Sequence, residues 1–429
     1  MPATVIIGGQ WGDEGKGRIV DLLAQRASIV ARYSAGNNAG HTVVNHLGTF
    51  KLHIVPAGIF YGDKTCIIGN GVAIDPKRLL AEIEDLQRRG VSTERLMISE
   101  RAHVIMPYHP IIDRLDEELR GPLAIGTTGV GVGPAFVDKV GRIGIRLVDL
   151  VEPKVFGERL RRVLDYKNNF LTKLYGAEPL DFDAVYDEYV DYGRRLAPFV
   201  EDTTVVVQEA LDRGEEVLLE GAQGALLDLD FGTYEYVTSS VPSSLAAGAA
   251  LGVGIGPNEI QRTVGVYKAY QTRVGFGPMP TELFDETAAV ISGRGQEFGT
   301  TTGRARRCGW FDAVAARYTV RLNGMTSAVL TRLDVLDTLP ELSICTSYRV
   351  GGVDSKSFPA NLTALSRCEP VYESMPGWQQ PTSDARTFGD LPAAAQNYVR
   401  RLESLLGCPV SLISVGPERG QAVYLREIT

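Results

Sequence analysis

Near its start the chain carries the segment Gly8-Gly9-Gln10-Trp11-Gly12-Asp13-Glu14-Gly15-Lys16-Gly17-Arg18. It follows an apolar run at residues 5–7, which predicts a short buried strand, and it precedes residues 19–23, whose apolar side chains recur at helical spacing. A strand, a glycine-rich loop and a helix in this order direct backbone N–H groups and the positive helix end at a phosphate. We therefore predict a phosphate-binding loop here.

The glycine spacing differs from that of a Walker loop. The Walker pattern places four residues between its first Gly and Gly-Lys and then requires Ser or Thr. Here five residues separate Gly9 from Gly15, and Gly17 follows Lys16. The loop also carries Asp13, and a carboxylate beside a polyphosphate is costly unless it binds a metal, takes a proton from a substrate, or does both. The alternative is a structural turn with a solvated Asp13, which five glycines, one lysine and two acids in this segment disfavour.

Composition excludes several classes of protein. The chain is 44% hydrophobic and 22% charged, as in soluble globular proteins, and its net charge of -8 disfavours a nucleic-acid partner. No apolar run reaches the roughly 18 residues that span a bilayer, and the first residues lack the basic segment of a signal peptide. The five cysteines are scattered without a CxxC pair, which argues against a zinc site. We expect a cytoplasmic protein with no nucleic-acid or membrane partner.

Strands and helices are predicted to alternate along the chain. Strands are expected at residues 29–33, 65–69, 95–99, 216–220, 327–333, 342–348 and 410–414. Helices are expected at residues 76–89, 110–120, 242–254 and 393–406. This order favours an α/β fold with a large, mostly parallel central sheet flanked by helices. We expect a hairpin at 43–55, a long polar loop at 293–309, and one domain over 1–429 with smaller inserted subdomains, including a helical segment at about 150–213.

Ordered motifs cover essentially the whole chain: residues 11–17 (WGDEGKG), 38–42 (NAGHT), 126–129 (GTTG), 220–224 (EGAQG), 236–240 (YVTSS), 281–285 (TELFD), 301–304 (TTGR), 333–334 (LD) and 414–417 (SVGP). With these motifs the chain resembles the adenylosuccinate synthetase family. The resemblance implies a P-loop-like nucleotide-binding architecture and a GTP- and Mg²⁺-dependent ligase. Such an enzyme joins L-aspartate to IMP through a 6-phosphoryl intermediate and releases adenylosuccinate, GDP and phosphate, the first committed step of AMP synthesis.

The expected catalytic residues are Asp13, His41 and Gln223. The 6-oxygen of hypoxanthine is a poor nucleophile until N1–H is removed, and a carboxylate such as Asp13 can take that proton. His41 would donate to the oxygens between the β- and γ-phosphates, although a His in a polar loop is by itself more often a solvated surface residue. Gln223 would hydrogen-bond the 6-oxygen. The resemblance also implies that Asp13 and the carbonyl of Gly40 hold Mg²⁺.

Binding residues follow from the same resemblance, matched position by position. For GTP they are Gly12, Glu14, Gly15, Lys16, Gly17, Arg18, Gly40, Thr42, Arg306, Arg332, Leu333, Asp334, Ser414, Val415 and Gly416. For IMP they are Asp13, Lys16, Asn38, Ala39, Thr128, Arg142, Gln223, Thr238 and Arg304. For aspartate they are Thr300, Thr301, Thr302, Arg304 and Arg306. In the family the arginine matching Arg142 reaches the neighbouring subunit's IMP site, which implies a homodimer; by itself, Arg142 reads as a surface salt-bridge residue.

Two binding roles have a clear physical basis. The Asp334 carboxylate can accept from both N1–H and the 2-amino group of guanine, a donor pair that adenine lacks, so it would select GTP over ATP. The two carboxylates of aspartate require forked guanidinium donors, which Arg304 and Arg306 supply.

Several positions depart from the family pattern, among them Val130, Phe231, Val241 and Ala305. These departures leave open a paralogue that performs the same chemistry on a modified purine-like nucleotide in secondary metabolism. A third reading, a GTP-binding module without catalysis, is opposed by the intact Asp13.

Overall fold

The computed structural model describes residues 3–45, 47–298 and 305–428. Its centre is a ten-stranded sheet in the order β20-β19-β15-β11-β1-β10-β2-β5-β7-β9. All neighbouring strands pair in parallel except β19 and β20. The strands are β1 (Ala3–Gly8), β2 (Ile29–Arg32), β5 (Thr65–Ile68), β7 (Leu96–Ser99), β9 (Val200–Glu201), β10 (Val217–Glu220), β11 (Ile260–Lys268), β15 (Ser327–Thr331), β19 (Val410–Ser414) and β20 (Ala422–Tyr424). The expected α/β fold is confirmed.

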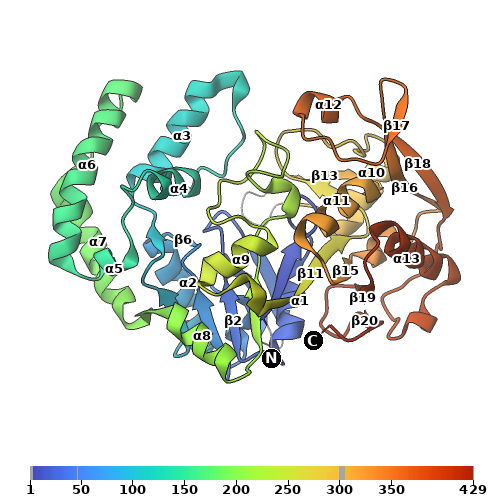
Figure 1. Ribbon diagram of the computed structural model, residues 1–429, viewed down its shortest axis with the longest axis horizontal. Helices are drawn as coiled ribbons and strands as arrows, with labels where there is room; N and C mark the ends of the chain where they lie inside the picture. The colour runs from blue at the N-terminus through green and yellow to red at the C-terminus, as the bar shows by residue number, and fades with distance from the viewer. Residues whose placement is uncertain (1–2, 46, 299–304, 429) are drawn as a thin grey trace.

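Helices cover both faces of this sheet (Figure 1), as an almost entirely parallel sheet requires. Side chains alternate along β1: Ile6 packs into one apolar cluster, and Val5 and Ile7 into the other. The cluster around Ile6 includes residues of α1 (Lys16–Ala24) and α2 (Pro76–Arg88). The opposite cluster includes residues of α9 (Ala246–Val253), α11 (Ala313–Asn323) and α13 (Ala393–Leu406). The core therefore lies on both sides of the strand that leads into the glycine-rich loop.

Insertions surround this core (Figure 1). The helices between residues 108 and 212 are α3 (Tyr108–Arg120), α4 (Val132–Val140), α5 (Leu147–Leu150), α6 (Pro153–Tyr175), α7 (Phe182–Leu196) and α8 (Thr203–Asp212), and α8 packs on the central sheet. Smaller pieces are β3 (His41–Asn45), β4 (Gly48–Leu52), β6 (Ala73–Ile74), β8 (His103–Val104), β12 (Gln271–Arg273), α10 (Glu286–Gly295), β13 (Arg307–Gly309), β14 (Phe311–Asp312), β16 (Glu341–Val350), β17 (Val353–Ser355), α12 (Leu362–Ser366) and β18 (Glu369–Pro376). We infer that the chain forms one domain, because the central sheet pairs strands from both halves of the sequence.

Local sequence predicted many elements correctly. The helix at 393–406 and the strand at 410–414 have the expected bounds, and Asp75 caps α2 by accepting from the backbone N–H of Arg78. The helix expected at 242–254 begins only at Ala246. The polar loop expected at 293–309 was wrong at both ends, because residues 293–295 belong to α10 and residues 307–309 form β13.

The central strand β11 was not predicted, because polar residues and Gly265 interrupt its apolar pattern. Gly265 lies in a tightly packed place: a Cβ there would lie 2.2 Å from the sulfur of Met325, so that side chain would have to shift. No helix in the described part of the chain is long and apolar enough to cross a membrane.

Candidate active site

A cavity of about 510 Å³ lies where β1, β2, β10, β15 and β19 end. The carboxyl ends of parallel strands are the usual ligand site of such sheets. The residues expected from the sequence that line the cavity are Gly12, Asp13, Glu14, Gly15, Lys16, Gly17, Arg18, Asn38, Ala39, Gly40, His41, Thr42, Thr128, Gln223, Thr238, Arg306, Arg332, Ser414 and Gly416. Segments far apart in the sequence thus meet at one site.

Other expected residues lie elsewhere. Leu333, Asp334 and Val415 do not border the cavity, and Arg142 is exposed on the surface beyond α4. The candidates Thr300, Thr301, Thr302 and Arg304 fall outside the described residues.

The Glu14 carboxylate organises the glycine-rich loop. Its side chain is fully buried, and it accepts hydrogen bonds from the backbone N–H groups of Gln10 (3.1 Å) and Gly12 (2.8 Å) and from Nζ of Lys16 (2.6 Å). Asp13 adopts a left-handed backbone with φ of 59°, a conformation that non-glycine residues adopt mainly at special sites. Glu14 therefore shapes the loop, whereas the Asp13 side chain keeps 30% of its surface exposed.

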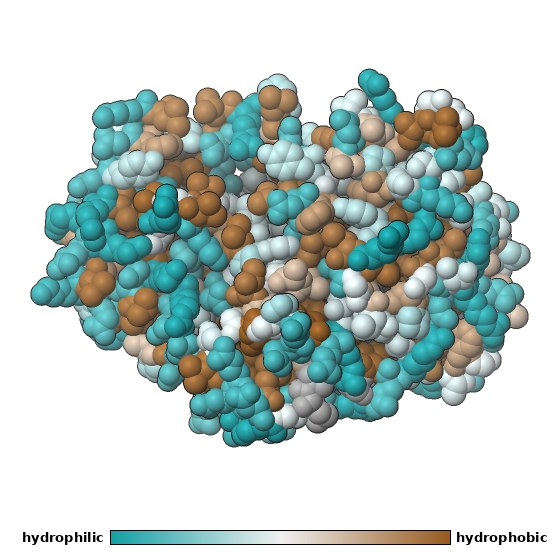
Figure 2. Space-filling view, viewed as in Figure 1, coloured by the Kyte–Doolittle hydropathy of each residue, from teal (hydrophilic) through white to brown (hydrophobic). Residues whose placement is uncertain are grey.

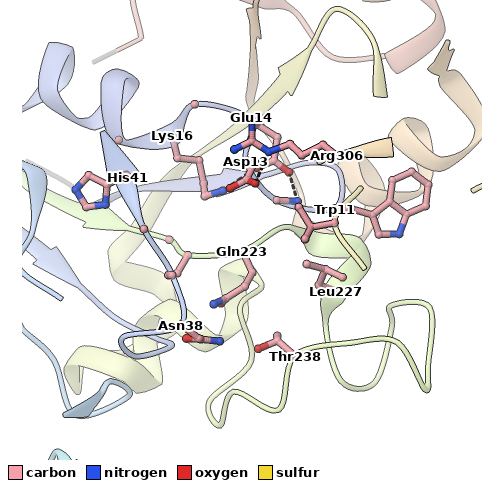
Figure 3. Close-up of a pocket in the computed structure, with 18 of the residues that line it drawn as sticks. Trp11, Asp13, Glu14, Lys16, Asn38, His41, Gln223, Leu227, Thr238 and Arg306 are labelled. Carbon is pink, nitrogen blue, oxygen red and sulfur yellow. Dashed lines mark hydrogen bonds and ion pairs between the residues drawn. The ribbon is translucent and has the colours of Figure 1, made fainter. Parts of the chain in front are cut away.

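Arg306 fixes the Asp13 carboxylate. Its Nε donates to Oδ2 of Asp13 at 2.7 Å, and its Nη1 donates to Oε2 of Glu297 at 2.6 Å (Figure 3 shows the Asp13 contact). Nζ of Lys268 donates to both oxygens of Glu297 at 2.8 Å. Burial alone would raise the pKa of Glu297, but the charges of Lys268 and Arg306 outweigh it and lower that pKa to about 2. Lys268, Glu297, Arg306 and Asp13 thus form a chain of ion pairs of alternating sign.

Sequence reasoning missed Lys268 and Glu297. They stand 29 positions apart, and the side chains of both are almost fully buried. The one available signal was a lysine following the apolar residues Val264, Val266 and Tyr267, because a buried lysine requires an acidic partner.

His41 is held in a buried setting next to α1. Its Nδ1 lies 3.5 Å from Oε1 of Glu220, and a Cβ on Gly17 would come within 2.7 Å of the imidazole. Burial, together with the charges of Arg32 and Lys16, lowers the pKa of His41 to about 3. The imidazole is therefore neutral at neutral pH, and only 15% of the side-chain surface is exposed, unlike that of a solvated surface histidine.

Several buried polar atoms in and beside the cavity find no hydrogen-bond partner within the described residues. They are Nε2 of His41, both amide atoms of Gln223, Oδ1 of Asn38 and Oδ1 of Asp334. Figure 3 shows Asn38, Gln223 and Thr238 across the cavity from Asp13 and Lys16. Buried polar atoms are normally paired, so this arrangement fits a polar ligand that contacts several loops at once.

A family model described as adenylosuccinate synthetase matches residues 5–423. The chain belongs to the adenylosuccinate synthetase family. Relatives with the name adenylosuccinate synthetase from Dehalococcoides mccartyi and Desulfitobacterium hafniense are 54% and 55% identical, and the matches cover 99% and 100% of this chain and 100% of each relative. The resemblance drawn from the motifs is confirmed, and the chain is a GTP-hydrolysing ligase of purine biosynthesis.

Two solved structures share the fold. Fully ligated adenylosuccinate synthetase from Plasmodium falciparum is 36% identical, with a TM-score of 0.93 over 99% of this chain and 100% of that chain. The succinoaminodeoxyadenylate synthetase of cyanophage S-2L, bound to dGMP and dATP, is 22% identical, with a TM-score of 0.62 over 99% of this chain and 95% of that chain. The second likeness shows the fold alone.

Arg18, on α1, contacts the loop that follows β19. Its Nη1 donates to Oγ of Ser414 and to the carbonyl of Gly416, and its Nη2 donates to the carbonyls of Glu418 (2.6 Å) and Gln421 (2.9 Å). Arg18 therefore ties the loop after β19 to α1. Its guanidinium holds the protein's own carbonyls in addition to lining the cavity.

The described residues contain no group of three His, Cys, Asp or Glu side chains that could hold a metal ion. A Mg²⁺ ion commonly takes only one or two carboxylates and completes its shell with substrate phosphates and water. Asp13 fits this pattern because it is partly exposed in the cavity and Arg306 donates to its Oδ2 alone.

The buried setting of His41 predicts that its imidazole stays neutral in the ligand-free protein. Because the pKa is lowered by folding, protonation favours the unfolded state, and stability from this group declines as pH falls from about 6.5 towards 3. NMR titration of labelled histidine, assigned with His41→Asn, should show no His41 midpoint between about pH 5 and 8. A midpoint near the ordinary histidine value would contradict the described environment.

Proposed function

We propose that this chain ligates L-aspartate to IMP at the expense of GTP, through a 6-phosphoryl-IMP intermediate, and that Asp13 is the catalytic base. The observation that carries the assignment of Asp13 is its place in the phosphate loop, partly exposed in the cavity and fixed by Arg306 at 2.7 Å. Family membership supplies the reaction.

In the first step Asp13 takes the proton from N1 of the purine. The 6-oxygen becomes anionic and attacks the γ-phosphorus, while the bond from that phosphorus to the β,γ-bridging oxygen breaks and GDP leaves. Lys16, held by Glu14 at 2.6 Å, places a fixed positive charge near the phosphates. His41 donates a hydrogen bond to the oxygen that gains charge. Mg²⁺ held by Asp13 and the carbonyl of Gly40 would neutralise phosphate charge when bound.

In the second step the amine of aspartate attacks C6, the bond between C6 and the phosphorylated oxygen breaks, and the proton lost by the amine leaves with the departing hydrogen phosphate. The unpartnered amide of Gln223 supports a contact with the 6-oxygen during both steps. Arg306 supports the aspartate site, because the contacts of its Nε with Asp13 and of its Nη1 with Glu297 hold the guanidinium in place. We assign Arg304 and the threonines at 300–302 to the same subsite from the family motif.

Selection of GTP is assigned to Asp334. Burial raises the pKa of Asp334, and its Oδ1 is buried without a partner within the described chain, so a donor of guanine would satisfy this oxygen. Asp334 does not border the cavity itself, but it lies two positions after Arg332, which does. Arg332, with a left-handed φ of 63°, precedes the short helix that carries Asp334 and offers a flat cation to the base.

The phosphate of IMP is assigned to Asn38, Thr128 and Thr238, which line the cavity from three loops. A second subunit would add Arg142, whose exposed side chain makes no hydrogen bond or ion pair with the rest of the described chain. Exposed apolar residues lie on the adjacent helices, namely Leu119, Leu123, Val137 and Val140. In Figure 2 hydrophobic side chains lie among hydrophilic ones over the region of α3 and α4, which suits a contact with a second copy.

Omission of one reactant at a time tests the reaction. Phosphate release, and a product with the mass of adenylosuccinate, should be seen only when IMP, GTP, aspartate and Mg²⁺ are all present. ATP in place of GTP should give little product, because adenine lacks the hydrogen-bond donors that the Asp334 carboxylate would accept from guanine. Phosphate release without aspartate at the full rate would count against ligation. A higher kcat/KM for an IMP analogue altered in the base would favour the paralogue with another acceptor.

Mixing two inactive variants tests the shared site. Arg142→Leu and Asp13→Asn should each be nearly inactive, because each damages every site of a homodimer. When equal amounts of the two variants are mixed and their subunits reassociate at random, half of the dimers contain one subunit of each kind. Each mixed dimer has one intact site of its two, so about a quarter of the wild-type activity should return. No recovery, despite mixed dimers seen by native mass spectrometry, would place Arg142 outside the partner's site.

A further inference from the structure

The loop between α3 and α4 forms one wall of the cavity. Ile125, Gly126, Thr127 and Thr128 all border it. Their backbone is held by a single carboxylate, that of Glu117 on α3. Its Oε1 accepts from the N–H of Ile125 at 3.0 Å, and its Oε2 accepts from the N–H groups of Gly126 at 2.6 Å and Thr127 at 3.1 Å.

A second carboxylate on the same helix holds the other end of this loop. Oδ2 of Asp113 accepts from the N–H of Gly131 at 2.9 Å, and Asp113 is buried. Asp113 and Glu117 are four residues apart, which puts them on one face of α3. The helix therefore fixes the loop at both ends.

The helix that carries these carboxylates is itself anchored. Nε2 of His109 lies 2.9 Å from Oδ2 of Asp138 on α4, and Asp138 also pairs with Lys167 on α6. The hydroxyl of Tyr175, at the end of α6, donates to Oδ1 of Asp116 at 2.5 Å. The loop is thus attached to a rigid support built from three helices.

Glu117 does not border the cavity, whereas the four loop residues do. Its carboxylate therefore lies behind the loop. Three successive N–H groups around one anion form a nest of the kind that binds phosphate elsewhere, and here the protein's own carboxylate fills it. A substrate phosphate consequently meets the side chains of the loop and not this nest.

We propose that Glu117 is a positioning residue for the phosphate of the acceptor nucleotide. By holding the N–H groups of residues 125–127 it fixes the backbone that presents Thr128 to the cavity. This inference rests on the proposed function, in which Thr128 contacts the phosphate of IMP.

Glu117→Gln tests the proposal, because glutamine keeps one acceptor oxygen and replaces the other with a donor. The KM for IMP should rise about tenfold. The KM for GTP and kcat should stay within about twofold of the wild-type values, since Glu117 does not hold the loops assigned to GTP. Glu118→Gln is the matched control, because Glu118 is an exposed neighbour on the same helix, and it should leave all constants unchanged.

Two further measurements separate positioning from a general structural role. Hydrogen exchange should accelerate at the amides of residues 125–127 in Glu117→Gln and not in Glu118→Gln. The double variant Glu117→Gln/Thr128→Ala should have the same KM for IMP as Thr128→Ala alone, because Glu117 acts through Thr128. The proposal would be overturned if Glu117→Gln left the KM for IMP unchanged, or raised the KM for GTP equally. It would also be overturned if amide exchange at residues 125–127 were unchanged, or if Glu117→Gln and Thr128→Ala had independent effects on the KM for IMP. If the wild type failed to turn over IMP, the proposed function would fail, and the exchange measurement would still report whether Glu117 holds the loop.

Discussion

The geometry of the cavity depends first on one buried carboxylate. Glu14 has no exposed surface, so its charge is tolerable only because two loop N–H groups and Lys16 surround it. The loop must turn sharply for these groups to reach the Glu14 carboxylate, and Gly12 and Gly15 take left-handed conformations with φ of 88° and 89°. Asp13, between them, is turned out of the loop and becomes the acid that Arg306 contacts. The same turn therefore positions the carboxylate that we propose as the base.

The charges around the cavity are arranged before any ligand arrives. Arg306 is oriented by Glu297, and Lys16 by Glu14. Such fixed charges need no reorganisation when charge moves from the purine oxygen to the departing GDP, which is where electrostatic catalysis gains most. His41 fits the same scheme, because an imidazole kept neutral by burial can donate one hydrogen bond without adding a charge.

Much of this site could be predicted from the sequence, because the ligand-facing groups lie in short glycine-rich loops with recognisable spacing. Asp13, His41 and Gln223 were predicted, and all three line the cavity. What the sequence could not reveal are the supports, whose partners are remote. Arg306 and Asp13 are 293 positions apart, and neither residue's neighbours indicate the other. The central strand β11 was missed for a related reason, since its polar residues are explained only by tertiary partners.

The central claim is that Asp13 makes the purine oxygen able to capture the γ-phosphoryl group. Positional isotope exchange measures that capture directly, using GTP labelled with oxygen-18 in the β,γ-bridge and incubated with IMP and Mg²⁺ without aspartate. The account predicts that the label scrambles into the non-bridging β-positions with the wild type. With Asp13→Asn, scrambling should fall to the level seen without IMP, although GTP still binds. Scrambling at the wild-type rate in Asp13→Asn would contradict the account.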